Sequence, residues 1–275
     1  MNIIFFGTPS FVVPVLEKLY EKYTVTGVVT APDKKVGRKQ LLTPSPVKQF
    51  AIKNAIPVFD DLTIENFKSK IPQTDLFVVA AYGKIIPQEI LDIPKFGAVN
   101  IHPSHLPQYR GPSPLTETIK NGDTKTAISF ILMDAQMDHG AILKQIPYQL
   151  TGTETFATLA EHIFTKSAEL LPDLINDYVE KKLTPAPQDD SKATYTKMVT
   201  KQDGFIDLEN PPSKTKLQQL IRAYYPWPTV WTRVNEKIIK FLPNNMIQME
   251  GKNPVTLKDF LNGYPETKEV LQKLI

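Results

Sequence analysis

Two side chains that could do chemistry, Asn100 and His102, end an apolar segment that reads Ala-Val-Asn-Ile-His from residue 98. They are two positions apart, so both side chains leave the same face of an extended backbone. An amide that forms hydrogen bonds would then lie beside a titratable base. Both side chains could instead serve only as hydrogen-bond partners for the backbone of a turn. The pair together with the proline-rich loop at 103–114 favours a functional role over this structural one. The pattern predicts a ligand crevice at the carboxyl end of a strand.

A carboxylate that could assist His102 stands further along the chain, in the turn Met137-Asp138-His139-Gly140. A catalytic base usually needs a second group that fixes its tautomer, so Asp138 could orient His102 or hold a water beside it. An aspartate in such a turn is also common for structural reasons alone. Whether the two residues meet depends on the fold.

The segments that must position these residues alternate between strand and helix patterns. Apolar runs at 2–6, 24–30, 76–81 and 97–101 are interspersed with helical patterns near 10–20 and 46–54. This alternation predicts an α/β domain with a Rossmann-like, mostly parallel sheet and helices on both faces. The first strand–helix turn, Gly7-Thr8-Pro9-Ser10, has one glycine where a dinucleotide fingerprint needs three, so NAD binding is rejected.

The remaining chain divides into a long helix, a linker and a smaller unit. Two strands are predicted at 126–133 and 142–150, and a helix at 154–179. Residues 181–202 have little periodicity and several prolines, which is typical of a linker. The predicted domains are therefore 1–180, a linker at 181–202, and 203–275. In the last of these we expect a helix at 214–224 and strands at 229–234, 238–242 and 246–249.

Composition sets further limits. The chain has 275 residues, 41% of them hydrophobic, with no cysteine and a net charge of +3. This is typical of a soluble globular protein, excludes disulfides and thiolate metal sites, and fits a cytoplasmic location. The N-terminal run indicates a buried strand and not a signal peptide, and no apolar run predicts a membrane span. Residues 34–48 carry five cations and no acid, which suits a polyanionic partner.

Together, Asn100-Ile101-His102, Ser104-His105-Leu106-Pro107 and Asp138 resemble the catalytic signature of the folate-dependent formyltransferases. Further motifs are similar to the members that formylate methionyl-tRNA. These motifs are Gly7-Thr8-Pro9 with Phe11, Val13-Pro14-Val15-Leu16, the loop from Pro32-Asp33 to Lys48, Ala81-Tyr82-Gly83, Arg110-Gly111, Ala193-Thr194-Tyr195, Asp203-Gly204, Arg222-Ala223 and Pro226-Trp227-Pro228. The resemblance covers nearly the whole chain.

The resemblance implies transfer of a formyl group from 10-formyltetrahydrofolate to an amine, with no metal and no nucleotide cofactor. Asn100 and His102 would donate hydrogen bonds to the tetrahedral oxyanion, and Asp138 would set the protonation of His102. The folate would be bound by Ser104, His105, Leu106 and Pro107, and by Ala81, Tyr82, Gly83 and Ile86. His105 and His139 stand where the family usually has leucine and threonine, yet their loop context argues against a metal site.

The resemblance also implies a tRNA partner, methionyl-initiator tRNA, and no obligatory protein partner. Lys34, Lys35, Arg38 and Lys39 match the basic loop that the family inserts into the acceptor arm. The family ends in an OB-like barrel of about five strands, whereas only two or three strand patterns follow Trp231. We therefore expect a shortened, truncated OB-like C-terminal domain, with Trp227 and Trp231 as core residues.

Three alternatives stay open. The same catalytic residues could formylate an amino sugar nucleotide, which the short C-terminal domain favours. Water in place of the amine would give a formyl-folate hydrolase. A non-catalytic RNA-binding protein on the same scaffold is disfavoured, because binding alone does not need Asn100, His102 and Asp138. The basic loop and the Trp-containing motif favour tRNA.

Overall fold

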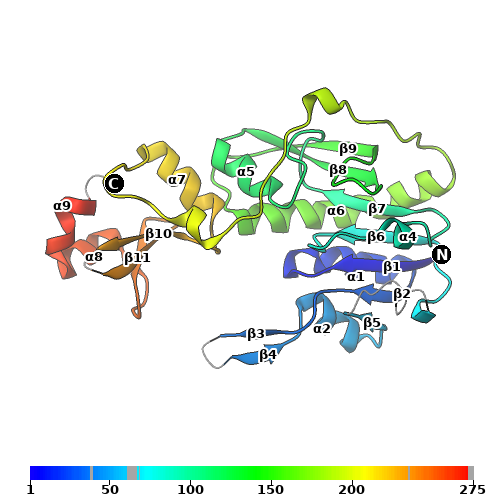
Figure 1. Ribbon diagram of the computed structural model, residues 1–275, viewed down its shortest axis with the longest axis horizontal. Coiled ribbons are helices and arrows are strands. Elements are labelled where there is room, and N and C mark those ends of the chain that lie inside the picture. Colours follow the sequence, from blue (N-terminus) through cyan, green and yellow to red (C-terminus); the bar gives the residue numbers. More distant parts are fainter. Residues whose placement is uncertain (38–39, 61–66, 68, 235, 272–275) are drawn as a thin grey trace. The chain divides into compact units, whose positions relative to one another are not determined.

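Figure 1 shows a computed structural model of the chain, which describes residues 1–37, 40–60, 67, 69–234 and 236–271. The chain divides by contacts into two compact units. The first unit contains Met1–Pro112, Ala127–Tyr148 and Ala160–Tyr195. The second contains Ser113–Thr126, Gln149–Leu159 and the chain from Thr196 onward. The division into domains 1–180 and 203–275 with a linker at 181–202 stays a prediction.

Within the described residues, the first unit is built on a seven-stranded sheet of order β5-β2-β1-β6-β7-β8-β9. The strands from β5 to β7 run parallel, and β8 is antiparallel to β7. The mostly parallel Rossmann-like sheet is thus confirmed. The strands are β1 (Asn2–Gly7), β2 (Thr24–Val29), β5 (Val58–Phe59), β6 (Leu76–Ala80), β7 (Ala98–His102), β8 (Lys125–Leu132) and β9 (Ala141–Gln149).

Helices bury the sheet on both faces, which explains why the central strands are continuously apolar. Ile3, Ile4, Phe5 and Phe6 of β1 have no exposed surface. The helices with bounds wholly or partly in this unit are α1 (Val13–Lys22), α2 (Pro46–Lys53), α4 (Gln88–Leu91) and α6 (Phe156–Val179), with 3-10 turns at η1 (Ser10–Val12) and η2 (Asp190–Lys192). None of the helices in the described ranges is long and apolar enough to cross a membrane.

The basic stretch predicted as a loop contains a β-hairpin. β3 (Lys34–Val36) pairs antiparallel with β4 (Leu41–Thr43), and the pair projects from the sheet of the first unit in Figure 1. Three-residue strands are too short to show an alternating pattern, so the sequence did not reveal them. Lys34 and Lys35 are exposed on β3. The predicted tRNA-binding residues Arg38 and Lys39 lie outside the described residues.

One lysine anchors the base of this hairpin. Lys48 Nζ lies 2.7 Å from Asp33 Oδ1 and 2.8 Å from Asp60 Oδ2, and Asp33 directly precedes β3. Replacing Lys48 by methionine keeps the stem and removes both ion pairs. We expect the free energy of unfolding to fall by about 1–2 kcal/mol, measured by denaturant unfolding. Lys53→Met, an exposed position on the same helix, is the control, and equal losses in both variants would contradict the prediction.

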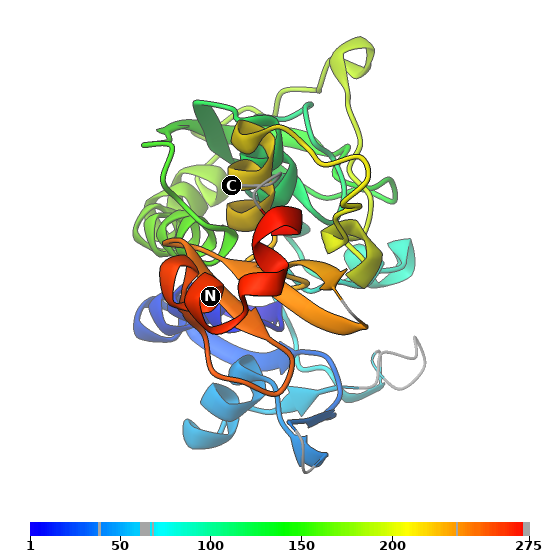
Figure 2. The same cartoon turned by 90° about the vertical axis from the view of Figure 1, so that its left-hand side faces the viewer.

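The second unit contains a four-stranded antiparallel sheet of order β10-β11-β12-β13 over the residues described there. Figure 2 shows these strands in orange beside α8 and α9 in red. The elements are α5 (Pro114–Asn121), η3 (Lys201–Gly204), α7 (Lys214–Ala223), β10 (Val230–Val234), β11 (Lys237–Leu242), β12 (Met246–Met249), β13 (Val255–Thr256), α8 (Leu257–Gly263), η4 (Pro265–Thr267) and α9 (Lys268–Leu271).

This small antiparallel β region agrees with the expected short C-terminal domain, with one more strand, β13, than the sequence indicated. Its core contains Ile221, Val230, Ile239 and Phe241. Trp231 is buried, and its indole N–H donates to the carbonyl of Lys201 at 3.0 Å. Trp227 is 59% exposed, so its assignment to the core was wrong. It stands between two prolines in a turn, where aromatic character alone does not determine burial.

Candidate active site

Three side chains converge where β7 ends. Asp138 Oδ1 accepts a hydrogen bond from Asn100 Nδ2 at 3.2 Å and lies 3.4 Å from His102 Nδ1. Asn100 and His102 come from β7, and Asp138 comes from the loop between β8 and β9. The fold therefore brings together the amide, the imidazole and the carboxylate that the sequence singled out 38 residues apart.

Sheet pairing explains why the two β7 side chains are held so closely. Asn100 lies opposite Val79 of β6 and Ile131 of β8, and His102 lies opposite Ser129. With a strand on either side, the backbone of β7 has little freedom. Asn100 and His102 are only 8% and 4% exposed. Buried side chains with fixed partners are preorganised, as a catalytic site requires.

The second nitrogen of His102 is also held. Nε2 lies 3.0 Å from the carbonyl oxygen of Tyr109. A carbonyl can only accept, so this partner places a hydrogen on Nε2. Nδ1 is then the nitrogen that faces Asp138. A second hydrogen on Nδ1 would complete the contact with the carboxylate and leave the ring positively charged.

The carboxylate of Asp138 has its own anchors. Its Oδ2 accepts from the backbone N–H of Gly111 at 2.8 Å, and its φ of +51° is left-handed. Burial raises the pKa of Asp138, but the charge and hydrogen bond of His102, the N–H of Gly111 and the charge of Arg110 together hold it below its usual value. Asp138 is therefore ionised at neutral pH.

Two side-chain hydrogen bonds stabilise the loop at Ser104–Pro107, which is predicted to hold the folate. Ser104 Oγ donates to the carbonyl of Gln108 at 2.6 Å, and Ser129 Oγ donates to the carbonyl of Ser104 at 2.6 Å. Leu106 is buried, whereas His105 is exposed, and the bond between Leu106 and Pro107 is cis. The Ser104 side chain thus stabilises the conformation of the loop, and the His105 side chain is exposed to solvent.

The other predicted folate segment follows β6 at the same edge of the sheet. Tyr82 and Ile86 belong to the buried core of the first unit, and burial raises the pKa of Tyr82 to about 12. Ala81 and Gly83 have positive φ values of 45° and 80°. Because the Tyr82 and Ile86 side chains face the core, they shape this segment from within.

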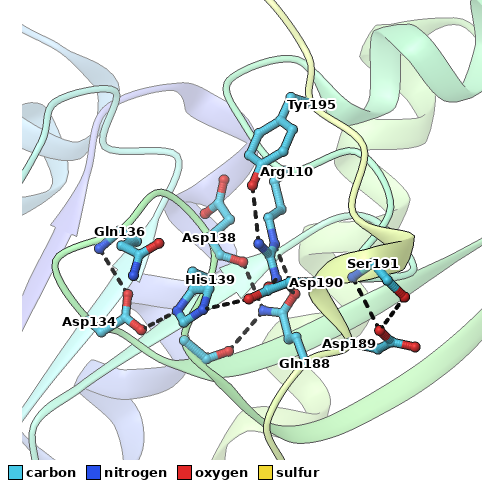
Figure 3. Close-up of polar contacts among 11 residues, drawn as sticks. Arg110, Asp134, Gln136, Asp138, His139, Gln188, Asp189, Asp190, Ser191 and Tyr195 are labelled. Carbon is cyan, nitrogen blue, oxygen red and sulfur yellow. Dashed lines mark hydrogen bonds and ion pairs between the residues drawn. The ribbon is translucent and has the colours of Figure 1, made fainter.

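Two residues of the site were not assigned a role from the sequence. Arg110 is 1% exposed, and its Nε and Nη2 donate to Gln188 Oε1 at 3.0 and 2.9 Å. Nη2 also donates to Asp190 Oδ1 at 2.7 Å, and Nη1 to the hydroxyl of Tyr195 at 3.3 Å (Figure 3). Arg110 belongs to the Arg110-Gly111 motif of the family resemblance. Gln188 lies in the predicted linker at 181–202, whose sequence has no periodic pattern that would indicate a role.

His139 forms a pH-sensitive contact next to this cluster. Its Nδ1 lies 2.6 Å from Asp134 Oδ2, and its Nε2 lies 3.4 Å from Asp190 Oδ2. The hydrogen bond that the His139 ring donates to Asp134 raises the pKa of His139, and the charges of Asp134 and Asp190 add to this against the opposing effect of burial. A raised folded pKa stabilises the protein below the unfolded value and ceases to do so as the pH rises through the folded value.

His139→Asn should therefore lower the free energy of unfolding by about 0.2–1 kcal/mol near pH 5.5 and by almost nothing near pH 8.5. Denaturant titrations at the two pH values measure the difference. His162→Asn is the control, because the His162 ring faces the hydroxyl of Tyr148 at 3.4 Å and forms no ion pair with a carboxylate of the described residues. A stabilising effect of His139 that grows with pH would contradict the prediction.

This chain is similar to known proteins over most of its length. The chain matches the family described as formyl transferase over residues 1–175, and the formyl transferase C-terminal domain over 198–246. A methionyl-tRNA formyltransferase from Roseiflexus sp. (strain RS-1) is 40% identical over 248 residues, covering 87% of this chain and 76% of the relative.

Solved structures share the fold. A methionyl-tRNA formyltransferase from Clostridium thermocellum aligns with a TM-score of 0.61 at 22% identity, covering 93% of this chain and 96% of that one. A sugar N-formyltransferase from Shewanella aligns with a TM-score of 0.67 at 17% identity, covering 88% and 96%. At such identities these two likenesses show the fold alone. The family match and the sequence relative go further: the chain belongs to the formyl transferase family, and within it to the methionyl-tRNA formyltransferases.

Proposed function

We propose that this chain transfers the formyl group of 10-formyltetrahydrofolate to the α-amino group of methionyl-initiator tRNA. The observation that carries the proposal is the convergence of Asn100, His102 and Asp138 at the carboxyl end of β7, in a chain of this family. Translation initiation takes place in the cytoplasm, which is where the proposal locates the enzyme. It requires no metal, no nucleotide cofactor and no obligatory protein partner.

In the proposed reaction the methionyl amine attacks the formyl carbon, and a new C–N bond forms as the carbonyl electrons move to oxygen. Asn100 keeps a second amide hydrogen beyond the one directed to Asp138, and can donate it to that oxyanion. His102 would be the second donor, with one ring N–H turning from its partner in the substrate-free site to the oxyanion. The bond to the folate nitrogen then breaks. The proton lost by the amine passes to that nitrogen, directly or through water, with Asp138 as the carboxylate that relays it.

The folate would lie against the backbone after β6. Val79 of β6 pairs with Asn100 of β7, so the residues from Ala81 to Ile86 leave the sheet beside the catalytic side chains. Exposed backbone groups there can bond a pterin ring, and Ser104–Pro107 would form the opposing wall. Sheet edges of this kind are where α/β proteins bind ligands.

The tRNA would be bound in part by the hairpin of β3 and β4. Lys34 and Lys35 are exposed on β3, and we expect them to act on phosphates together with Arg38 and Lys39. Such contacts weaken steeply as salt increases, because bound counterions are released. A KM for methionyl-tRNA that rises with salt, with an unchanged KM for folate, would support this assignment.

The test is transfer of labelled formyl from 10-formyltetrahydrofolate, with methionyl-tRNA, uncharged tRNA and an amino sugar nucleotide as parallel acceptors. We expect label on methionyl-tRNA alone. Label on the sugar nucleotide would contradict methionyl-tRNA as the acceptor and would support formyl transfer as the reaction. Label released only as formate would indicate a hydrolase, and no turnover of the folate would indicate a binding protein.

A further inference from the structure

The loop that carries Asp138 is tightly folded and needs a support. Asp138 has a left-handed φ of +51°, a region that aspartate adopts more readily than most residues but that still makes the chain turn sharply. Two residues on, a Cβ at Gly140 would lie 1.9 Å from the carbonyl oxygen of Leu132. Such a backbone persists only where surrounding contacts hold it.

Gln188 supplies such a contact from a distant part of the chain. Its Nε2 donates to the carbonyl oxygens of Asp138 and Gly140, both at 2.8 Å (Figure 3). One amide group thus binds the backbone on both sides of His139. A single amide nitrogen reaches both carbonyl oxygens, so the contact depends on this loop conformation.

The other end of the same amide is equally engaged. Gln188 Oε1 accepts two hydrogen bonds from the buried guanidinium of Arg110. Arginine only donates and carbonyls only accept, so the amide has one satisfactory orientation. A glutamate could replace the oxygen that faces Arg110 but could not donate to the carbonyls. An asparagine is one methylene shorter.

Backbone pairing positions Gln188 itself. Ala186 exchanges hydrogen bonds with Ile142 of β9, at 2.8 and 2.9 Å, and the N–H of Arg110 donates to the carbonyl of Thr194 at 2.8 Å. The segment that carries Gln188 is therefore hydrogen-bonded to β9 on its N-terminal side, and on its C-terminal side to Arg110 in the loop that follows β7. All of these groups belong to the first unit.

We propose that Gln188 is a positioning residue for formyl transfer: its amide holds the backbone of Asp138 so that the carboxylate stays in contact with Asn100 and His102. This inference rests on the proposed function. Gln188 bonds the loop and Arg110, and acts on the reaction through Asp138. Displacement of a catalytic group by about 1 Å can reduce the rate about 100-fold.

The test compares Gln188→Ala and Gln188→Glu with the wild-type enzyme. We expect both variants to lower kcat about 10- to 100-fold with little change in the KM for methionyl-tRNA. The kcat of Gln188→Glu should be no higher than that of Gln188→Ala, because a carboxylate cannot donate to the two carbonyl oxygens and would repel them. Since contacts with His102 and Gly111 hold the pKa of Asp138 low, their loss should move the acid limb of the kcat profile to higher pH. Gln136→Ala, an exposed glutamine of the same loop, should behave like wild type.

Several outcomes would overturn the inference. Wild-type kcat in Gln188→Ala would show that the loop needs no such support. Full activity in Gln188→Glu would show that the residue only serves Arg110. If Gln188→Ala does not fold, Gln188→Asn carries the same test, and wild-type kcat and pH profile in that variant would overturn the inference. An inactive wild-type enzyme would instead refute the proposed function, so the two failures are distinguishable.

Discussion

Replacing His102 by alanine is expected to lower kcat for formyl transfer about 100- to 1,000-fold, the usual cost of losing one oxyanion donor. The ring is buried and contacts both Asp138 and the carbonyl of Tyr109, so the substitution removes a side chain that two partners hold in place. Because the effect lies in the transition state, the KM for both substrates should change much less than kcat. Single-turnover transfer of labelled formyl measures the chemical step directly.

The control for this experiment is His162→Ala, an exposed histidine on α6. It should keep the wild-type rate within about twofold. Asn100→Ala should resemble His102→Ala, since both side chains are assigned to the same oxyanion. A double variant that loses less than the product of the two single losses would show that they act together. Normal turnover in His102→Ala with intact folding would exclude the proposed mechanism.

Asp138→Asn is expected to lower kcat about 100- to 10,000-fold, the range for a group that controls proton transfer. Asparagine is nearly the same size and tolerates a left-handed φ, so the loop should keep its conformation. The variant removes the negative charge that faces His102 Nδ1. It therefore separates the charge of Asp138 from its structural role, and steady-state kinetics with folate and methionyl-tRNA measure the result.

Asp134→Asn is the matched control, because it removes a carboxylate from the same loop at a position that faces His139. Its kcat should change by no more than about twofold. In the wild-type enzyme the pKa of Asp138 is held below its usual value, so protonation of this group should reduce kcat only as the pH falls below that value. An acid limb assigned to Asp138 above its usual pKa, or a fully active Asp138→Asn, would contradict the assignment.

Local patterns were enough to predict the parallel part of the sheet. Strands buried on both faces are continuous apolar runs, as in β1 and β6, and each run is visible without knowledge of its neighbours. The same holds for the Asn100–His102 pair, because the two-residue repeat of a strand fixes their common face. Short strands such as β3 and β13 carry too few residues to show any repeat, so they were not predicted.

The sequence by itself determined the types of chemical group at the site, an amide, an imidazole and a carboxylate, and the strand end that holds two of them. Only the tertiary structure decided that Asp138 meets them, because a contact between residues 38 positions apart depends on how β8 returns antiparallel along β7 and delivers the following loop to the end of that strand. It also decided that Gln188 belongs to the site. A hydrogen bond from a non-periodic segment to two backbone carbonyls leaves no pattern in the sequence, since its specificity lies entirely in three-dimensional geometry.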